Sequence, residues 1–226
     1  MYFIQKNLTR LNNNQSTFFL DPRELRDVKG KLKKSEYKIY YPYKDSEKNI
    51  IYKKNTPEVL LYEIKVKVLV RHQDILGSIY SLNISHELFG DILIIENRYF
   101  IYILPIVRNY FESNFLMVRN SSVELELLDI DYLKDYERSY EELELIVSSN
   151  RIDTVISSIC RCGRNNIGEM IKKKEIMLNY DFLKDSSYKL RDNDIFSIKR
   201  IGKFKYIGVL KNTKSNHLII KVLKYL

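Results

Sequence analysis

Cysteine is scarce in this sequence of 226 residues, which limits the metal chemistry that it can support. The two cysteines, Cys160 and Cys162, have no second pair and no nearby histidine to complete the four ligands of a zinc site. Two of the three histidines, His72 and His86, lack an obvious nucleophile or metal partner, and we interpret them as capping or packing residues. We therefore expect no metal site and no cofactor.

Long apolar runs are also missing. No stretch of about 18 uncharged apolar residues could span a bilayer, and the first residues lack the apolar run of a signal peptide. Hydrophobic residues make up 45% of the chain and charged residues 30%, which provides enough apolar side chain to fold. We therefore expect a globular cytoplasmic protein with no membrane span.

The common motifs of catalysis are absent as well. The sequence contains no glycine-rich phosphate loop, no nucleophile elbow and no pair of histidines at metal spacing. Catalysis needs several chemical groups at defined spacing, and no such set can be recognised. We therefore expect no enzymatic activity and name no catalytic residue.

Positive charge, in contrast, is abundant and unevenly distributed. The formal net charge is +9, and residues 151–226 hold 17 Lys/Arg against 7 Asp/Glu, a net of +10. Residues 1–70 carry 15 against 8, whereas residues 71–150 carry 6 against 14, a net of −8. A segregated basic block is typical of proteins that bind a phosphate backbone, because each neutralised phosphate releases condensed counterions.

The local patterns indicate an α+β protein of several small domains. Domains commonly run from about 50 to 200 residues, so the length alone allows one large domain or several small ones. We predict a small N-terminal α/β region at 1–62, a middle domain at 63–144 and a C-terminal domain at 145–226.

The N-terminal region contains one well-marked helix. Asp21 can serve as its N-cap and Pro22 already has a helical φ, which together predict a helix over 22–29. Two short strands, 37–41 and 49–52, are expected to follow around a polar turn.

The middle domain shows the element order β-α-β-β-α-β. The expected elements are strand 63–70, helix 74–82, strand 91–95, strand 98–103, helix 105–117 and strand 123–127. This is the ferredoxin-like arrangement, which RNA-recognition modules also use. Acidic charge and the lack of a Lys/Arg-Gly-aromatic strand nevertheless argue against RNA binding here, and we interpret Tyr99, Phe100 and Tyr102 as packing residues.

A new domain follows an acidic connector at 132–144 and a short strand at 145–147. Apolar residues at helical spacing predict two helices, the first from Ile152 and the second around Ile167, separated by Gly163. Further strands are expected at 176–179, 195–200, 204–210 and 217–223. The opposite faces of the two helices are basic.

Short motifs in this basic domain resemble the S-four RNA-binding domain. They are Arg151-Ile152-Asp153, Arg164-Asn165, Ile171, 176–179 and Asp194-Ile195. Other segments resemble the YlmH family, and with them the resemblance covers nearly the whole chain. These segments are 19–24, 63–64, 72–78, 90–94 and 197–204.

The resemblance implies a bacterial factor that recognises large ribosomal subunits obstructed by peptidyl-tRNA. It would support ribosome-associated quality control and C-terminal alanine tailing, and the family is also associated with cell division. The implied partners are rRNA of the large subunit and the alanine-tailing quality-control factor; direct contact with peptidyl-tRNA is left open. We expect a ribosome-associated monomer in the cytoplasm.

The expected RNA-binding residues are Arg151, Arg164, Asn165, Lys172, Lys173, Lys174, Lys199, Arg200, Lys203 and Lys205. The arginines would make forked bonds to phosphates, and the lysines would follow the neighbouring backbone. Alternatively, Arg151 pairs with a local acid and the 172–174 run is a solvated helix face. Side chains alternate between the two faces of a strand, so several of the cations within 199–205 would share one face and extend the basic patch. Alternatively, these cations protect an edge strand from pairing with another chain. Asp153, Asn179 and Asp194 are expected to be structural.

Two residues depart from the S-four pattern. Lys174 stands where the domain usually has glycine after its second helix, and Gly163 stands where a small hydroxyl residue often precedes Arg164. A left-handed conformation at Lys174 would cost about 1 kcal/mol, although its charge could contact phosphate.

Two other classes of function remain as alternatives. One is an RNA-modifying enzyme of the pseudouridine-synthase type, which would need a separate catalytic domain that residues 1–144, divided into two smaller parts, do not provide. The other is a scaffold for cell-division proteins that uses the acidic middle domain as its contact surface.

Overall fold

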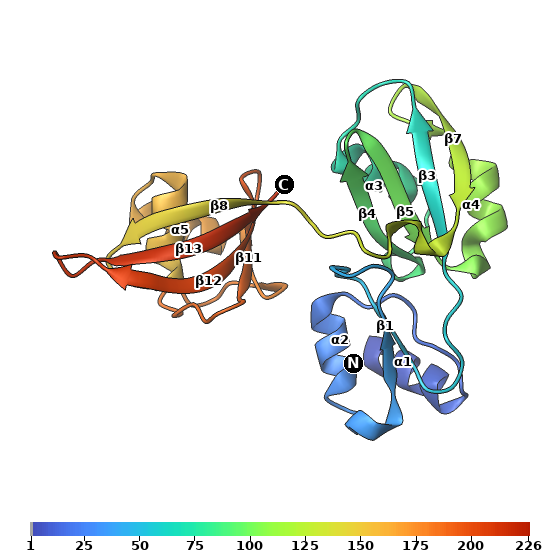
Figure 1. The fold of residues 1–226 in the computed structure, drawn as a ribbon, viewed down its shortest axis with the longest axis horizontal. Helices are drawn as coiled ribbons and strands as arrows, with labels where there is room; N and C mark the ends of the chain where they lie inside the picture. Colours follow the sequence, from blue (N-terminus) through green and yellow to red (C-terminus); the bar gives the residue numbers. More distant parts are fainter. Residues whose placement is uncertain (1) are drawn as a thin grey trace. The chain divides into compact units, whose positions relative to one another are not determined.

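The computed structural model describes residues 2–226 and divides into two compact units, Met1–Glu137 (unit 1) and Arg138–Leu226 (unit 2) (Figure 1). Both units combine helices with antiparallel strands, so the predicted α+β class is confirmed at that level. Within residues 2–226, no helix is both long and apolar enough to cross a membrane.

Unit 1 begins with two helices and a small two-stranded sheet. These elements are α1 (Tyr2–Asn12), α2 (Pro22–Lys29), a 3-10 turn (Lys34–Glu36), β1 (Lys38–Tyr40) and β2 (Ile50–Tyr52). Helix α2 starts at the predicted cap, where the Asp21 carboxylate accepts from the Glu24 N–H at 2.7 Å and the Glu24 carboxylate accepts from the Asp21 N–H at 3.0 Å. Gly30 ends the helix as expected.

The rest of unit 1 is built on a five-stranded antiparallel sheet. Its elements are β3 (Leu60–Val66), α3 (His72–Ser81), a 3-10 turn (His86–Leu88), β4 (Phe89–Ile95), β5 (Arg98–Ile103), a 3-10 turn (Pro105–Val107), α4 (Arg108–Asn114), β6 (Met117–Val118), β7 (Ser121–Leu128) and a 3-10 turn (Ile130–Leu133). The strand order across the sheet is β4-β5-β3-β7-β6. The predicted order β-α-β-β-α-β is present, with β6 added at one edge.

Both faces of this sheet are covered. On one face, α3 and α4 contribute Ile75, Ile79 and Phe111 to a core with alternate strand residues. On the other face, Phe19 and Tyr43 pack with Phe100 and Tyr102 of β5. Phe19 and Tyr43 belong to the segment from α1 to β2, residues 2–52, which we call the N-terminal part. The rings of Tyr43 and Tyr102 stack with centroids 5.8 Å apart. Tyr99, Phe100 and Tyr102 are all buried, which confirms that they are packing residues.

Unit 2 contains two helices on one face of a six-stranded sheet. Its elements are β8 (Tyr140–Val147), α5 (Ile152–Cys160), α6 (Arg164–Lys172), β9 (Ile176–Leu178), β10 (Asp181–Phe182), β11 (Ile195–Ile198), β12 (Gly202–Asn212) and β13 (Leu218–Tyr225). The strand order is β10-β9-β11-β12-β13-β8. Ile156 of α5 and Ile167 of α6 pack with Phe204 and Ile220 of the sheet in one apolar core.

The predicted domain boundaries differ from the structure in two places. The boundary after residue 144 falls inside β8, and the segment 132–144, expected as a connector, enters that strand at Tyr140. The reason is pairing over long sequence separation, because β8 joins β13 and its acids meet lysines there, Glu142 with Lys221 at 2.7 Å. The boundary after residue 62 falls inside β3.

The helix expected over 105–117 is also shorter than predicted. The segment starts as a 3-10 turn at Pro105, becomes α4 at Arg108 and ends at Asn114. Met117 and Val118 then turn back as β6 to pair with the start of β7.

Candidate nucleic-acid interface

Arg151 is the N-cap residue of α5, and an acidic neighbour holds its side chain. Its Nε and Nη2 donate to Oδ1 and Oδ2 of Asp153 at 3.1 and 2.6 Å. The buried Asp153 carboxylate also accepts from the Thr154 N–H at 2.8 Å. The guanidinium holds the pKa of Asp153 below its usual value. The structure thus shows the local pairing that the sequence left as the alternative, although an arginine has five N–H donors and Asp153 occupies two.

Arg164 lies close to this pair. It is the first residue of α6, its side chain is exposed, and its Nη2 donates to Oγ1 of Thr154 at 3.3 Å. Asn165 follows as another exposed residue. Thr154 therefore links the Arg151–Asp153 pair to Arg164, which brings the two predicted arginines together. The N–H groups of the first turn of a helix also favour a negatively charged ligand.

The three lysines lie at the other end of α6. Each residue of an α-helix advances about 1.5 Å along the helix axis, so these lysines are well separated from Arg164. Lys172, Lys173 and Lys174 are exposed, and Lys172 donates to Glu169 one turn back at 2.8 Å. Lys174 has a φ of 55°, and its N–H donates to Ile171 O at 2.9 Å. The predicted left-handed conformation at Lys174 is therefore confirmed, and a charged side chain occupies a position that favours glycine.

Lys199 and Arg200 join these lysines. They form the turn between β11 and β12, and both are exposed. The Lys199 N–H donates to Glu175 O at 2.8 Å, which fixes the turn beside the residue that follows Lys174. Five predicted cations thus gather at the C-terminal end of α6, and we call them the lysine cluster: Lys172, Lys173, Lys174, Lys199 and Arg200.

Lys203 and Lys205 lie elsewhere. They alternate along β12 with Phe204 and Tyr206, which are buried in the core beneath the helices, so the two lysines occupy the helix-free face of the sheet. The Lys203 ammonium donates to Tyr180 Oη at 3.1 Å and lies 4.9 Å from the ring centroid of Tyr225. The predicted alternation is correct, but it separates these two residues from the lysine cluster.

Sequence reasoning missed three cations near Arg151. Lys184, Lys189 and Arg191 are exposed in the loop before β11. Lys189 forms an isolated β-bridge with Arg151, and the Ile152 N–H donates to Tyr188 O at 2.8 Å, so this loop lies along the start of α5. Three cations within eight residues were the available signal, but nothing in their local pattern pointed to Arg151.

Among residues 2–226, no three His, Cys, Asp or Glu side chains gather closely enough to hold a metal ion. Burial raises the pKa of the Cys160 thiol to about 11, so this cysteine is protonated at neutral pH. A protonated thiol is a poor metal ligand and a poor nucleophile.

Three comparisons with known proteins agree with the resemblance to YlmH. A family model described as "Putative RNA-binding domain in YlmH" matches residues 56–132. The "Ribosome-associated protein quality control protein P2" of Bacillus subtilis (strain 168) is 24% identical over 213 residues, which cover 88% of this chain and 83% of that protein. The solved structure "Cell division protein ylmH from Streptococcus pneumoniae" matches with a TM-score of 0.50 at 21% identity, over 59% of this chain and 93% of that chain.

The family match falls on the β3–β7 part of unit 1. Its description is at odds with our expectation, drawn from acidic charge, that this part does not bind RNA. The aromatic residues of β5 are nevertheless buried under the N-terminal part. Stacking of bases on Phe100 or Tyr102, the usual mode of an RNA-recognition sheet, is therefore blocked in this structure.

Proposed function

This chain resembles the YlmH proteins, and from that premise we propose that it is a non-enzymatic RNA-binding protein that holds rRNA of the large ribosomal subunit through unit 2. The observation that carries the proposal is the placement of the cations. Arg151 and Arg164 meet at one end of α6, and the lysine cluster gathers at the other. Asp153 pairs with Arg151 and Glu169 pairs with Lys172, but residues 151–226 keep a net charge of +10.

The chemistry of the surface suits phosphates more than bases. Arginine forks bind phosphate oxygens at two points, and lysine ammonium groups follow a backbone without reading sequence. A-form RNA hides its base edges in a deep groove, so we expect recognition of the shape of a helix or a junction. Asn165 could add a hydrogen bond beside Arg164.

The finer assignments rest on the resemblance together with the fold. We propose that β3–β7 form a ferredoxin-like domain, supported by the strand order β4-β5-β3-β7, and that unit 2 contains an S-four-type domain with extra C-terminal strands. We also propose action in the cytoplasm on obstructed large subunits carrying peptidyl-tRNA, in support of alanine tailing. The name of the Bacillus subtilis relative favours ribosome-associated quality control.

A scaffold for cell-division proteins is the second candidate function. The name of the Streptococcus pneumoniae structure favours it. A scaffold would bind its protein partner through a protein surface, and that binding would change little with salt concentration. Binding to phosphates weakens steeply as the salt concentration rises.

Sucrose-gradient co-sedimentation tests the proposal. Wild type, Arg164→Ala and Lys214→Ala would each be mixed with ribosomes and with large subunits carrying peptidyl-tRNA. Lys214, an exposed lysine in the loop between β12 and β13, provides a control with the same loss of charge. We expect wild type and Lys214→Ala to travel with the obstructed subunits and Arg164→Ala to remain at the top.

The other outcomes are equally informative. If no variant sediments with any particle, the ribosome proposal is wrong, and a protein partner of unit 1 becomes the target. If Arg164→Ala binds as wild type does, the interface lies elsewhere. Loss with Lys214→Ala to the same extent would show that overall charge, and not this site, holds the RNA.

A further inference from the structure

Strand β7 has an open edge beyond its first residues. On one side it pairs with β3 from Val123 to Leu128. On the other side β6 reaches only Ser121 and Ser122, after which the Val123 N–H donates to Leu116 O at 2.9 Å. Since alternate residues of a strand direct their N–H and C=O to the same side, those of Leu125 and Leu127 also point away from β3. Residues 2–226 place no strand there.

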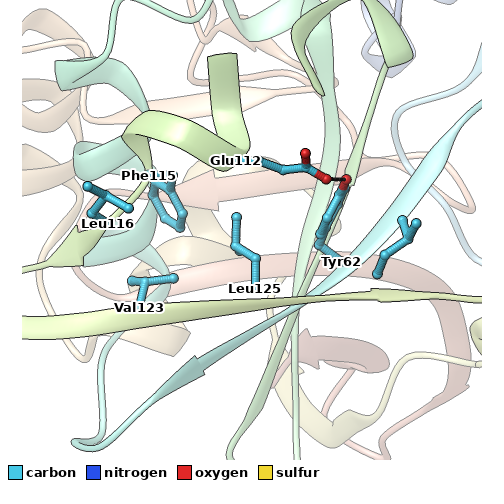
Figure 2. A pocket seen from close by; sticks show the side chains of 7 residues that line it. Tyr62, Glu112, Phe115, Leu116, Val123 and Leu125 are labelled. Carbon is cyan, nitrogen blue, oxygen red and sulfur yellow. Dashed lines mark hydrogen bonds between the residues drawn. The ribbon is translucent and has the colours of Figure 1, made fainter. Parts of the chain in front are cut away.

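A hollow of about 310 Å³, lined by apolar side chains together with Tyr62 and Glu112, lies beside this open edge, between β7 and the end of α4 (Figure 2). Leu125 and Leu127 line it from the strand, and Phe115 and Leu116 line it from the segment after α4. Leu116 is 56% exposed and Leu127 is 46% exposed, so both present apolar surface at this edge. The hollow therefore offers apolar contacts to any strand that pairs with β7.

Tyr62 and Glu112 form the polar part of the lining of the hollow. Figure 2 shows the Tyr62 hydroxyl directed at Glu112, to which it donates a hydrogen bond. Arg108 also donates to the Glu112 carboxylate, at 3.1 Å. These contacts hold the wall of the hollow in place without filling it.

The opposite face of the same edge is acidic. Glu124 and Glu126 alternate with the leucines and point to the other side of the sheet, where Glu126 pairs with Lys65 at 2.7 Å. Glu124 is exposed. A second copy of β7 would bring glutamates face to face, and RNA phosphates would meet the same repulsion. A strand with cations at alternate positions would be attracted.

We propose that the β7 edge and its hollow bind an extended segment of a protein partner in which apolar residues alternate with Lys or Arg. The segment would add as a strand to Leu125 and Leu127, place its apolar side chains in the hollow and direct its cations at Glu124. Backbone pairing would supply affinity, and the alternate side chains would supply specificity. This site is separate from the RNA interface of unit 2 and does not depend on it.

Charged side chains on an edge strand usually prevent strand pairing, and this is the alternative role of Glu124 and Glu126. Protection by charge does not require exposed apolar side chains at the same edge. Here one face carries glutamates, whereas the other leaves leucines exposed beside a hollow. Such a combination fits a selective site better than a blocked edge.

The test uses a short peptide in which valine and lysine alternate, added to the full-length protein. Binding would be followed by fluorescence anisotropy, and hydrogen exchange of the Leu125 and Leu127 amides by NMR. We expect saturable binding and slowed exchange at these two amides. A peptide with glutamate in place of lysine should not bind.

Four variants locate the site. Leu127→Ser and Glu124→Lys should each weaken binding by about tenfold or more, as expected for residues central to an interface. Their controls are Ile94→Ser, an exposed residue on the opposite edge strand β4, and Glu58→Lys, an exposed acid outside β7. Both controls should bind as wild type does, and circular dichroism should show that all four variants are folded.

Several outcomes would overturn the proposal. Peptide binding without slowed exchange at Leu125 and Leu127 would show simple charge attraction. Slowed exchange that depends on protein concentration without peptide would show a second copy as the occupant. Slowed exchange at Leu125 and Leu127 on addition of RNA without peptide would assign the edge to RNA, and no binding at millimolar peptide would leave an edge that is protected by charge.

Discussion

The Asp153 carboxylate accepts two hydrogen bonds from Arg151, one from Nε at 3.1 Å and one from Nη2 at 2.6 Å. The carboxylate is buried and the guanidinium is partly exposed, with 37% of its side chain accessible. The pair is therefore a structural contact that leaves part of the Arg151 side chain accessible to a ligand. An arginine has five N–H donors, so Arg151 can use two of them to hold Asp153 and still have donors for a phosphate.

Arg151→Ala should destabilise unit 2 at neutral pH, because the buried Asp153 carboxylate loses two hydrogen-bond partners. The lowered pKa of Asp153 means that this stabilisation is present above the usual aspartate pKa and is lost as pH falls through the lower, folded value. Urea unfolding of wild type and variant at pH about 7 and about 3 measures the difference. An equal difference at both pH values would show that the ion pair does not carry the effect.

Lys174 allows strain and charge to be separated. Lys174→Gly should stabilise the protein by about 1 kcal/mol, because glycine adopts a positive φ without steric cost. It should also weaken RNA binding by removing a cation of the lysine cluster. Lys174→Ala removes the same charge but keeps the strained φ, so it should weaken RNA binding equally without the gain in stability. Thermal unfolding and filter binding of all three proteins distinguish the two effects.

Lys199 and Lys203 should behave differently although both were predicted to bind RNA. The Lys199 side chain is exposed beside the lysine cluster, whereas the Lys203 ammonium already contacts Tyr180 and Tyr225. Lys199→Ala should therefore reduce the slope of log K against log salt by about 1, the change expected for one lost phosphate contact. Lys203→Ala should leave that slope unchanged and reduce stability. A reduced slope for Lys203→Ala would assign the helix-free face of the sheet to RNA as well.

Local signals in the sequence were sufficient for most elements. Asp21 and Pro22 marked the start of α2, and the alternation of apolar residues marked the strands of unit 1. Pairing between distant segments could not be predicted from the sequence. Glu141, Glu142 and Glu144 form an acidic run that does not look like part of a strand, and only the fold shows that lysines of β13 lie beside these glutamates. The boundary of unit 2 was therefore placed too late.

The same limit applies to the candidate site. Residue types predicted that Arg151, Arg164 and the lysines would be basic surface residues. Only the fold shows that Thr154 connects the two arginines. It also shows that the hydrogen bond from the Lys199 N–H to Glu175 O holds Lys199 near Lys174, and that the Lys203 ammonium donates a hydrogen bond to Tyr180. Contacts of this kind depend on the backbone path, which spacing along the chain does not specify.

Lys48 gives a prediction for unit 1, where it connects the N-terminal part to the sheet. Its ammonium donates to His86 O at 2.6 Å and Phe89 O at 2.9 Å, and lies 4.2 Å from the centroid of the Phe89 ring. Burial lowers the pKa of this amine to about 8, and the nearby Asp91 only partly opposes the shift. An ordinary lysine has a pKa of about 10.4.

The shift has a definite consequence for stability. Between the folded and unfolded pKa values the unfolded chain binds more protons at this site, so the contribution of Lys48 to stability should rise as pH increases from about 8 to about 10. Lys48→Arg remains charged over this range and should lack the rise. Urea unfolding of the two proteins measures this difference, and the shift of the Lys48 ε-carbon in NMR measures the pKa directly. A titration midpoint near 10 would mean that water reaches the ammonium, and the contact between the N-terminal part and the sheet would then be looser than its two carbonyl hydrogen bonds imply.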